Sequence, residues 1–263
     1  MYHFPSFHLG DMTACSAALR RLGDDATGLQ DVAGRIVAHL YRSFTILGTD
    51  QPACVLVRLF KTIRYDRLAP ELQRLAAQRI GGAPADPSIA CLTLLGSAGV
   101  IPGWNDPTQS GRFRVIPLSS PEEVDRLPMF SQLFHQIGWS LPSRTQPSAD
   151  LLVDRQEHAF NVFHILQAAG SPYVPAQEEF VGPFGVRSVL GFGAVLPDNE
   201  LFTVILFSRD TIPESVAQLF KSLALSVQVA LAPHVDGTAA PENRAGSSVR
   251  GAQPINALCG ADP

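Results

Sequence analysis

Two apolar segments in the second half of the chain constrain the fold most. The segments 188–196 and 201–208 consist almost entirely of apolar residues, and the turn Pro-Asp-Asn-Glu at 197–200 separates them. Two short apolar segments joined by such a turn predict a β-hairpin. Because apolar side chains fall on both faces of these segments, the hairpin is predicted to lie in the middle of a sheet that is covered on both sides.

The first of these segments has two unlike faces. Leu190, Phe192 and Leu196 point to one side, whereas Gly191 and Gly193 make the other side low and smooth. Glycine inside a strand marks a place where another part of the chain approaches closely. We therefore expect a close contact on the glycine side of this strand.

The spacing of apolar residues elsewhere predicts the remaining helices and strands. Apolar residues at helical spacing indicate helices, and runs rich in β-branched residues indicate strands. The Thr27 hydroxyl is expected to cap one helix, with Gln30 reaching back. Helices are predicted at about 13–22, from Thr27 to Phe44, from Pro70 to Ile80, from Ser120 to Ile137 with a break near Pro128, and from Thr211 to Leu231, and strands at 53–63, 90–95, 113–118 and from Phe160 onward.

The order of these elements predicts an α/β (α+β) fold. It is an antiparallel sheet of about five or six strands, with the terminal helices packed on one face and the linking segments over the other. A single domain is expected over residues 1–232, including an N-terminal helical extension. Residues 233–263 change to Gly, Ala, Ser, Pro and Asn without aromatic residues, which predicts a disordered tail.

Charge and cysteine usage exclude several classes of function. The net charge is −4, and the two lysines and eighteen arginines are scattered, which gives no footprint for nucleic acid. Cys15, Cys54, Cys91 and Cys259 lie far apart, whereas zinc sites and redox dithiols usually need a close pair. No secretory signal follows Met1, and the apolar runs look shorter than a membrane span. We therefore expect a cytoplasmic protein with reduced thiols that binds no nucleic acid and no membrane.

A resemblance to a known family enters at the start of the hairpin. The segment Phe184-Gly185-Val186-Arg187-Ser188-Val189-Leu190-Gly191, followed by the hairpin and an apolar terminal helix, resembles the end of a GAF domain, where a Gly-x-Arg-Ser turn feeds a central strand. The longer run 174–208 resembles GAF-like input modules that precede PAS and histidine kinase domains in bacterial signalling proteins. The resemblance covers about residues 11–232.

The resemblance implies a standalone sensory or regulatory domain of bacterial signal transduction. Such a domain binds a small molecule between the sheet and the linking segments, or acts by protein–protein contact without a ligand. Its terminal helices are expected to form a homodimer. No kinase, cyclase or DNA-binding segment follows, so a signalling kinase or other output protein is expected to act in trans.

Departures from the family narrow the expected ligand. The chain has no Asn-Lys dipeptide of the kind that accompanies cyclic nucleotide binding in GAF domains. No cysteine has a neighbouring histidine, as bilin attachment requires, and the cysteine positions do not match the members that reduce free methionine sulfoxide. The ligand stays unidentified at this stage.

No catalytic motif is present, so the chain is not expected to be an enzyme. There is no Gly-x-Ser-x-Gly elbow, phosphate loop, complete dinucleotide fingerprint or His-Glu-x-x-His helix. A small cysteine-dependent oxidoreductase is the alternative, and it would depend on Cys54 or Cys91. Scattered Ser, His and Asp residues that converge in space are a further alternative, because triads are recognised by geometry.

His158 and His164 form a weak candidate metal site. They are six residues apart, which would place both imidazoles on one face of a strand, as haem iron or another metal requires. Haem is therefore a possible cofactor, and a haem- or metal-based redox or gas sensor is an alternative function. Ordinary packed histidines are the competing interpretation.

The candidate ligand-binding residues are charged or aromatic side chains at the predicted strands and loops. A charge inside the apolar strand at 53–63 must meet a carboxylate, a ligand anion or solvent. The arginine of the Gly-x-Arg-Ser turn is interpreted first as a structural clamp and second as a ligand contact. The aromatic residues either line a cavity or belong to the core. The candidates are Arg58, Trp104, Phe113, His135, Phe160, His164, Arg187 and Phe192.

Overall fold

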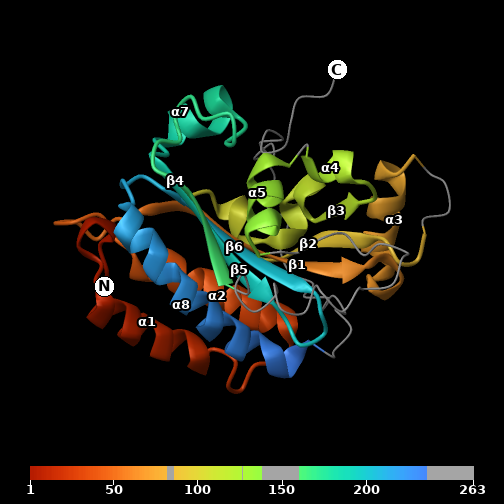
Figure 1. Cartoon of the computed structure of the whole chain (residues 1–263), viewed down its shortest axis with the longest axis horizontal. Helices are drawn as coiled ribbons and strands as arrows, with labels where there is room; N and C mark the ends of the chain where they lie inside the picture. The colour runs from red at the N-terminus through yellow and green to blue at the C-terminus, as the bar shows by residue number, and fades with distance from the viewer. Residues whose placement is uncertain (82–85, 126, 138–159, 236–263) are drawn as a thin grey trace.

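The computed structural model describes residues 1–81, 86–125, 127–137 and 160–235 (Figure 1). The strands are β1 (Cys54–Arg64), β2 (Ala90–Gly99), β3 (Val115–Leu118), β4 (Phe160–Ile165), β5 (Ser188–Val195) and β6 (Leu201–Ser208). The α-helices are α1 (Leu9–Arg21), α2 (Leu29–Ser43), α3 (Pro70–Arg79), α4 (Pro121–Asp125), α5 (Pro128–Ile137), α7 (Gly182–Phe184) and α8 (Glu214–Leu231). Short helices are η1 (Phe4–Ser6), η2 (Tyr65–Arg67), η3 (Pro102–Asn105), η4 (Pro107–Gln109), η5 (Gly111–Phe113), the π-helical turn η6 (Gln177–Val181) and η7 (Ala232–His234).

The strands of the described residues form one antiparallel sheet in the order β3-β2-β1-β6-β5-β4. The predicted hairpin is confirmed, since β5 pairs with β6 from Ser188 opposite Ser208 to Val195 opposite Leu201. Its partner on the other side is β1, which comes from far earlier in the chain. The central position of the hairpin and the predicted fold class are therefore both confirmed.

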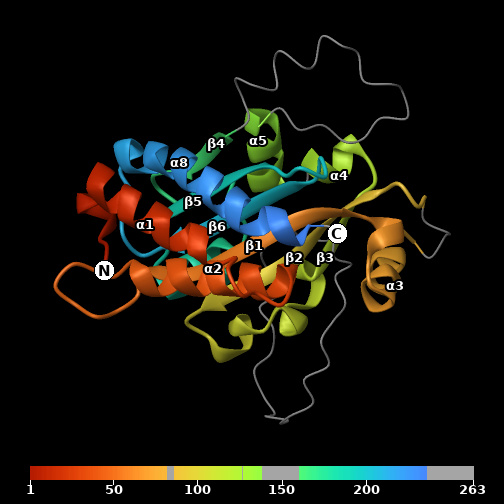
Figure 2. The same ribbon diagram turned by 90° about the horizontal axis from the view of Figure 1, so that it is seen from below.

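The terminal helices cover one face of the sheet, as predicted. Figures 1 and 2 show α1, α2 and α8 side by side on this face, which we call the helix face. Its core includes a cluster of aromatic rings with centroids 4.4–6.3 Å apart, contributed by Phe4, Phe7, Phe44, Phe192 and Phe220. Burying so much aromatic surface at the meeting point of η1, α2, α8 and β5 holds the terminal helices to the sheet.

The linking segments cover the opposite face, which we call the linker face. Here α5 lies over β4 and β5, and η3, η4 and η5 pack near β2 and β3 (Figure 1). Phe130 of α5 packs edge-on against Phe60 of β1 with centroids 5.2 Å apart. The linker face therefore has an apolar core of its own, separate from that of the helix face.

Close approach of a neighbouring element explains Gly193 of β5 and one further glycine, whereas Gly191 has ordinary van der Waals neighbours. A Cβ at Gly193 would lie 2.2 Å from the carbonyl oxygen of Phe202 in β6, and one at Gly191 would touch Phe163 at 3.6 Å. The expected contact on the glycine side of this strand is confirmed. In β2, a Cβ at Gly96 would lie 2.7 Å from the carbonyl oxygen of Ala33, so α2 packs directly on the strand backbone.

A buried ion pair fixes the turn of the hairpin to β1. Nζ of Lys61, which is buried, lies 2.8 Å from Oδ2 of Asp198 in the β5–β6 turn. The hydroxyl of the adjacent Thr62 donates to Glu200 at the other end of the turn. Burial raises the pKa of the Glu200 carboxyl above its ordinary value, against the opposing effects of that hydrogen bond and of Lys61. The polar turn read from the sequence is thus tied to the sheet by its own side chains.

Some element boundaries differ from the sequence predictions, and local capping explains one of them. The first helix begins at Leu9 rather than Thr13, because the His8 ring accepts from the Asp11 main-chain N–H while the Asp11 carboxylate accepts from His8. The last helix begins at Glu214 after Pro213. The strand predicted from Phe113 begins at Val115, since 111–113 form a 3-10 turn.

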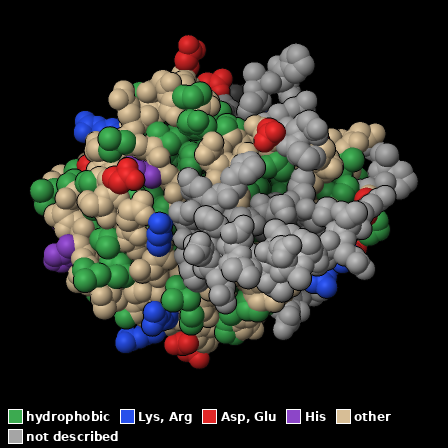
Figure 3. Space-filling view, in the orientation of Figure 1, with side chains coloured by type: hydrophobic (Ala, Val, Ile, Leu, Met, Phe, Trp, Pro, Cys, Tyr) green, Lys and Arg blue, Asp and Glu red, His purple; other side chains and the backbone are tan. Residues whose placement is uncertain are grey.

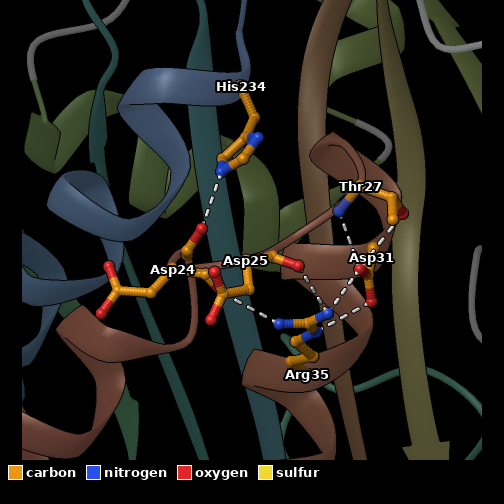
Figure 4. A network of polar contacts seen from close by, with 7 residues as sticks. Asp24, Asp25, Thr27, Asp31, Arg35 and His234 are labelled. Carbon is orange, nitrogen blue, oxygen red and sulfur yellow. Dashed lines mark hydrogen bonds and ion pairs between the residues drawn. The ribbon is translucent and has the colours of Figure 1, made fainter.

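The predicted cap of α2 by Thr27 is wrong. The helix begins after Gly28, and both the main-chain N–H and the hydroxyl of Thr27 donate to Oδ2 of Asp31, at 3.0 and 3.2 Å (Figure 4). Arg35 binds the same carboxylate at 2.8 Å. The Thr27 main-chain N–H and the Arg35 guanidinium hold the pKa of Asp31 below its ordinary value. The acidic residue one position after Gln30 therefore makes the contact expected of Gln30.

The same arginine joins the α1–α2 loop to α2. Its guanidinium donates to the carbonyls of Asp24 and Asp25 at 3.1 and 3.3 Å (Figure 4). On the other side of the loop, Nε2 of His234 in η7 lies 3.0 Å from the carbonyl of Gly23. This network fixes the loop against the end of the terminal helix.

Among the described residues, one helix, Glu214–His234, is long and apolar enough to cross a membrane, with a mean hydropathy of 1.4. The expectation that every apolar run falls short of a membrane span is therefore wrong for this stretch. Half of its window is buried in the structure, against α1 and the sheet. Apolar side chains that pack into a core account for this composition.

Candidate functional site

A buried arginine lies among aromatic side chains on the linker face. Arg58 of β1 is 5% exposed, and its guanidinium carbon lies 4.8 Å from the centre of the Phe113 ring. Charge above an aromatic ring is a favourable arrangement in a desolvated place. The sequence analysis expected a carboxylate, a ligand anion or solvent beside this charge, whereas the contact seen here is with an aromatic ring.

Two hydroxyl groups share this face of the sheet with Arg58. Ser97 pairs directly with Arg58 across the β1–β2 ladder, and directly paired residues project from the same face. Thr203 of β6 pairs with Phe60, two positions along β1. Both side chains are buried, at 6% and 0% exposure, and neither hydroxyl oxygen has a hydrogen-bond partner among the residues that the structure describes.

The segment 110–113, on the linker face, carries two more buried polar groups that lack a hydrogen-bond partner among the described residues. Ser110 precedes η5 and is 8% exposed, and its Oγ is without a hydrogen-bond partner in the described ranges. Nε of Arg112 is likewise buried without a partner there, and its guanidinium carbon lies 5.6 Å from the Phe113 ring. We call Arg58, Ser97, Ser110, Arg112 and Phe113 the linker-face cluster.

Of the residues predicted from the sequence, Arg58 and Phe113 come together in this cluster. Trp104 of η3 lies on the same face, but it packs against Phe180 and Phe184, with ring centroids 5.7 and 5.0 Å away. The Trp104 ring also packs against Gly99 of β2, since a Cβ added at Gly99 would lie only 2.9 Å from this ring.

The structure separates two other candidates from this cluster. Phe192 is fully buried on the helix face and packs on Phe220. Nε2 of His164 lies 2.8 Å from the carbonyl oxygen of Ile212, so this nitrogen is used to join β4 to the segment before α8. Alternation along a strand separates two faces, and these side chains fall on the face opposite Arg58.

Arg187 immediately precedes β5 and forms its hydrogen bonds through its main chain. Its N–H donates to the carbonyl of Ser208, and its carbonyl accepts from Ala168, both at 2.7 Å, while the side chain is exposed. Burial raises the pKa of the nearby Asp210, and the Arg187 guanidinium opposes that shift. The clamp expected at the Gly-x-Arg-Ser turn is thus a main-chain one.

The remaining candidates cannot be placed by their side chains. His158 lies outside the described residues, and so do the side chains of His135 in α5 and Phe160 in β4. Over the described part of the chain, no three His, Cys, Asp or Glu side chains are grouped so that they could hold a metal ion.

A shallow groove on the outer side of the terminal helices is a second feature of interest. It has a volume of about 580 Å³ and runs between α1 and α8. Leu9, Leu225 and Val229 on the same two helices are large apolar side chains with 41–65% exposure. The residues that line the groove are Met12, Thr13, Ser16, Ala17, Arg20, Lys221, Ser222 and Leu225.

Sequence reasoning missed Ser97, Ser110, Arg112 and Thr203. The same signal that selected Arg58, a polar residue inside an apolar strand, applies to Ser97 and Thr203. Serine and threonine are common in strands, however, so the signal is weak for them. Ser110 precedes η5 and Arg112 lies within it, and only the contact of the adjacent Phe113 with Arg58 places this turn near the sheet.

On the part of the face in Figure 3 that is not grey, acidic and basic side chains are interspersed and form no large patch of one sign. The strand order, with terminal helices on one face and linking segments over the other, is that of a GAF-like fold. No family model matches the sequence, and no curated protein matches it.

Similar solved structures include GAF domains of phytochromes. The phycocyanobilin-bound GAF domain from a cyanobacterial phytochrome aligns over 85% of this chain and 94% of its own, at 12% identity and a TM-score of 0.42. The phycoerythrobilin-bound GAF domain from a cyanobacterial phytochrome aligns over 87% and 99%, at 12% identity and 0.35. This chain covers 62% of the chromophore-binding domain of Stigmatella aurantiaca phytochrome P1, with 86% of itself, at 11% identity and 0.38. Likeness at this level says nothing about what this chain binds.

Proposed function

We propose that the chain is a sensory or regulatory GAF-like domain of bacterial signal transduction that binds a small molecule on the linker face. The observation that carries the proposal is the set of buried polar atoms there that lack hydrogen-bond partners in the described residues. Such atoms cost free energy in the folded state unless something satisfies them. A ligand with polar groups supplies the partners that they lack.

Ligand binding is proposed to change the arrangement of a homodimer and thereby the activity of an output protein. The domain is a cytoplasmic homodimer that contacts its copy through α1 and α8, and its output is a signalling kinase or other protein in trans. The exposed apolar side chains beside the α1–α8 groove support this arrangement. A ligand that favours one arrangement of the linker face shifts the equilibrium between two dimer states.

The chain is proposed to have no enzymatic activity of the cysteine-dependent kind. Cys15, Cys54 and Cys91 are free and buried. Burial raises the pKa of the Cys15 and Cys91 thiols to about 12, and raises that of Cys54 as well. Nucleophilic and redox chemistry requires a thiolate that solvent can reach.

Native alkylation tests this point. Because all three thiols are buried and protonated near neutral pH, we expect iodoacetamide at pH 8 to leave Cys15, Cys54 and Cys91 unmodified in the folded protein and to modify them in guanidinium. Peptide mass mapping of each cysteine measures this. Rapid modification of Cys54 or Cys91 in the folded protein would return the oxidoreductase to consideration.

The small-molecule proposal is tested on the full chain purified from its native host. Native mass spectrometry is expected to show a bound small molecule that is released on denaturation. An absorption spectrum of the same sample decides the haem alternative, because haem gives an intense band near the violet and a haem-free protein does not.

A matched pair of variants locates the ligand. Ser97→Leu replaces a buried hydroxyl of the linker face with a larger apolar side chain, and this variant is expected to lose the bound small molecule. Ser222→Leu, in the outer groove, is expected to keep the small molecule bound. Circular dichroism confirms that both variants fold. Absence of any retained molecule, together with equal behaviour of both variants, would indicate a docking domain that works without a ligand.

The dimer proposal makes a separate prediction. The full chain is expected to have twice the mass of one chain by light scattering, and L225E with V229E is expected to halve it, because two buried carboxylates oppose the apolar contact. Leu47→Glu is the control, since Leu47 is exposed on the loop between α2 and β1 and is not among the residues that line the groove. A wild-type monomer at micromolar concentration contradicts the proposal.

A further inference from the structure

We infer that the small molecule on the linker face carries a compact anionic group, a carboxylate or a phosphate, held by Arg112, Ser97 and Ser110 beside Phe113. This inference depends on the proposed function and assigns the chemical class of the ligand. Its basis is the kind of polar atom that the linker-face cluster presents, namely two hydroxyls and a guanidinium N–H.

The floor of the site supplies a hydroxyl and a positive charge. Ser97 is buried, and its Oγ has no hydrogen-bond partner within the described ranges. Arg58, its direct neighbour across the β1–β2 ladder, brings a guanidinium to 4.8 Å from the centre of the Phe113 ring. A negative group above this floor would accept a hydrogen bond from the Ser97 hydroxyl.

The roof of the site supplies a second hydroxyl and a second guanidinium. Ser110 and Arg112 flank the start of η5, and both the serine Oγ and the arginine Nε are buried without partners among the described side chains and main chain. The Arg112 guanidinium carbon is 5.6 Å from the same Phe113 ring. Because Phe113 belongs to the same turn and also contacts Arg58, its ring places this turn over the floor.

The acidic side chains nearby in the described chain are already engaged. Glu71 accepts from Arg114 at 2.7 Å, and the pKa of its carboxyl is lowered by that contact. Asp106 accepts from the main chain and hydroxyl of Thr108, at 2.8 and 2.7 Å, and from Gln109 at 3.1 Å. These carboxylates are therefore not the partners of Arg112 Nε.

An anion satisfies this set of donors better than a neutral or cationic group does. Hydrogen bonds from a guanidinium to a carboxylate or phosphate are about twice as strong as neutral ones, and hydroxyls also donate to such oxygens. A cation would be repelled by the Arg112 guanidinium in a place of low dielectric. Carboxylate and phosphate share this chemistry, so the experiment must separate them.

Calorimetric titration of the full chain with inorganic phosphate and, separately, with succinate tests the inference. At low ionic strength we expect millimolar or tighter binding of at least one probe, and the tighter probe identifies the head group. Arg112→Gln is expected to weaken binding about tenfold or more, the usual effect of losing a charge-assisted hydrogen bond. Ser97→Ala is expected to weaken it about two- to tenfold.

Arg114→Gln is the matched control, because Arg114 lies two residues away and pairs with Glu71. It is expected to bind the probes as the wild-type chain does. Absence of binding of both probes to wild type, or equal affinity in Arg112→Gln, overturns the anionic assignment. A neutral molecule retained by wild type and lost in Ser97→Leu would overturn this inference alone, whereas absence of any retained molecule would overturn the proposed function with it.

Discussion

Replacing Phe220 with alanine is expected to lower the free energy of unfolding by about 3–5 kcal/mol, the usual cost of removing a buried phenyl ring. The side chain is fully buried, and its ring lies 5.5–6.3 Å from those of Phe4, Phe7, Phe44 and Phe192. The cavity would open where η1, α2, α8 and β5 meet, so all of these contacts weaken together. Urea unfolding followed by circular dichroism measures the change.

The control for this substitution is Val229→Ala on the same helix. Val229 is 47% exposed, and a surface change of this kind usually alters stability by about 0.5 kcal/mol or less. A Phe220→Ala variant no less stable than Val229→Ala would show that the aromatic cluster does not hold α8 to the sheet.

Adding one methyl group at Gly96 is expected to destabilise the domain by about 1–3 kcal/mol, the usual cost of overpacking. The new Cβ would lie 2.7 Å from the carbonyl oxygen of Ala33 and 3.1 Å from the main-chain nitrogen of Gly34. Backbone atoms in a helix cannot move aside as a flexible side chain does, so α2 would have to lift from β2. Thermal and urea unfolding of Gly96→Ala measure the loss.

The opposite result is expected for Gly34→Ala, directly across this contact. Gly34 lies within α2, and no atom stands within 4 Å of a Cβ built there. Alanine inside a helix is usually favoured over glycine by about 0.5–1 kcal/mol. Equal effects of the two substitutions would mean that the approach of α2 to β2 is not tight.

Local patterns predicted the fold well because its central hairpin and its main helices carry strong signals. The apolar segments of β5 and β6 and the apolar stripes of α2 and α8 all form as expected. The pairing of β1 with β6 was not predictable from either strand alone, because it depends on residues far apart in the sequence. Capping details failed where a side chain other than the expected one, Asp31 instead of Gln30, made the contact.

The candidate site was predicted only in part, for a geometric reason. A charge inside an apolar strand is conspicuous, so Arg58 was found. Alternation along a strand tells which side chains share a face but not which face carries the site, so Phe192 and His164 were grouped with it. Ser97 became visible only through the β1–β2 register, and Arg112 only through Phe113.

The pairing of β1 with β6 also governs how this protein can be made in the cell. β1 can pair with β6 only after the ribosome has synthesised the chain through Ser208. The last helix of the helix face, α8, can pack on the sheet only after Leu231 has emerged. Domains with such distant pairings fold slowly and expose apolar strands meanwhile. Nascent chains of this protein are therefore expected to expose apolar strands until the segment through Leu231 has left the ribosome.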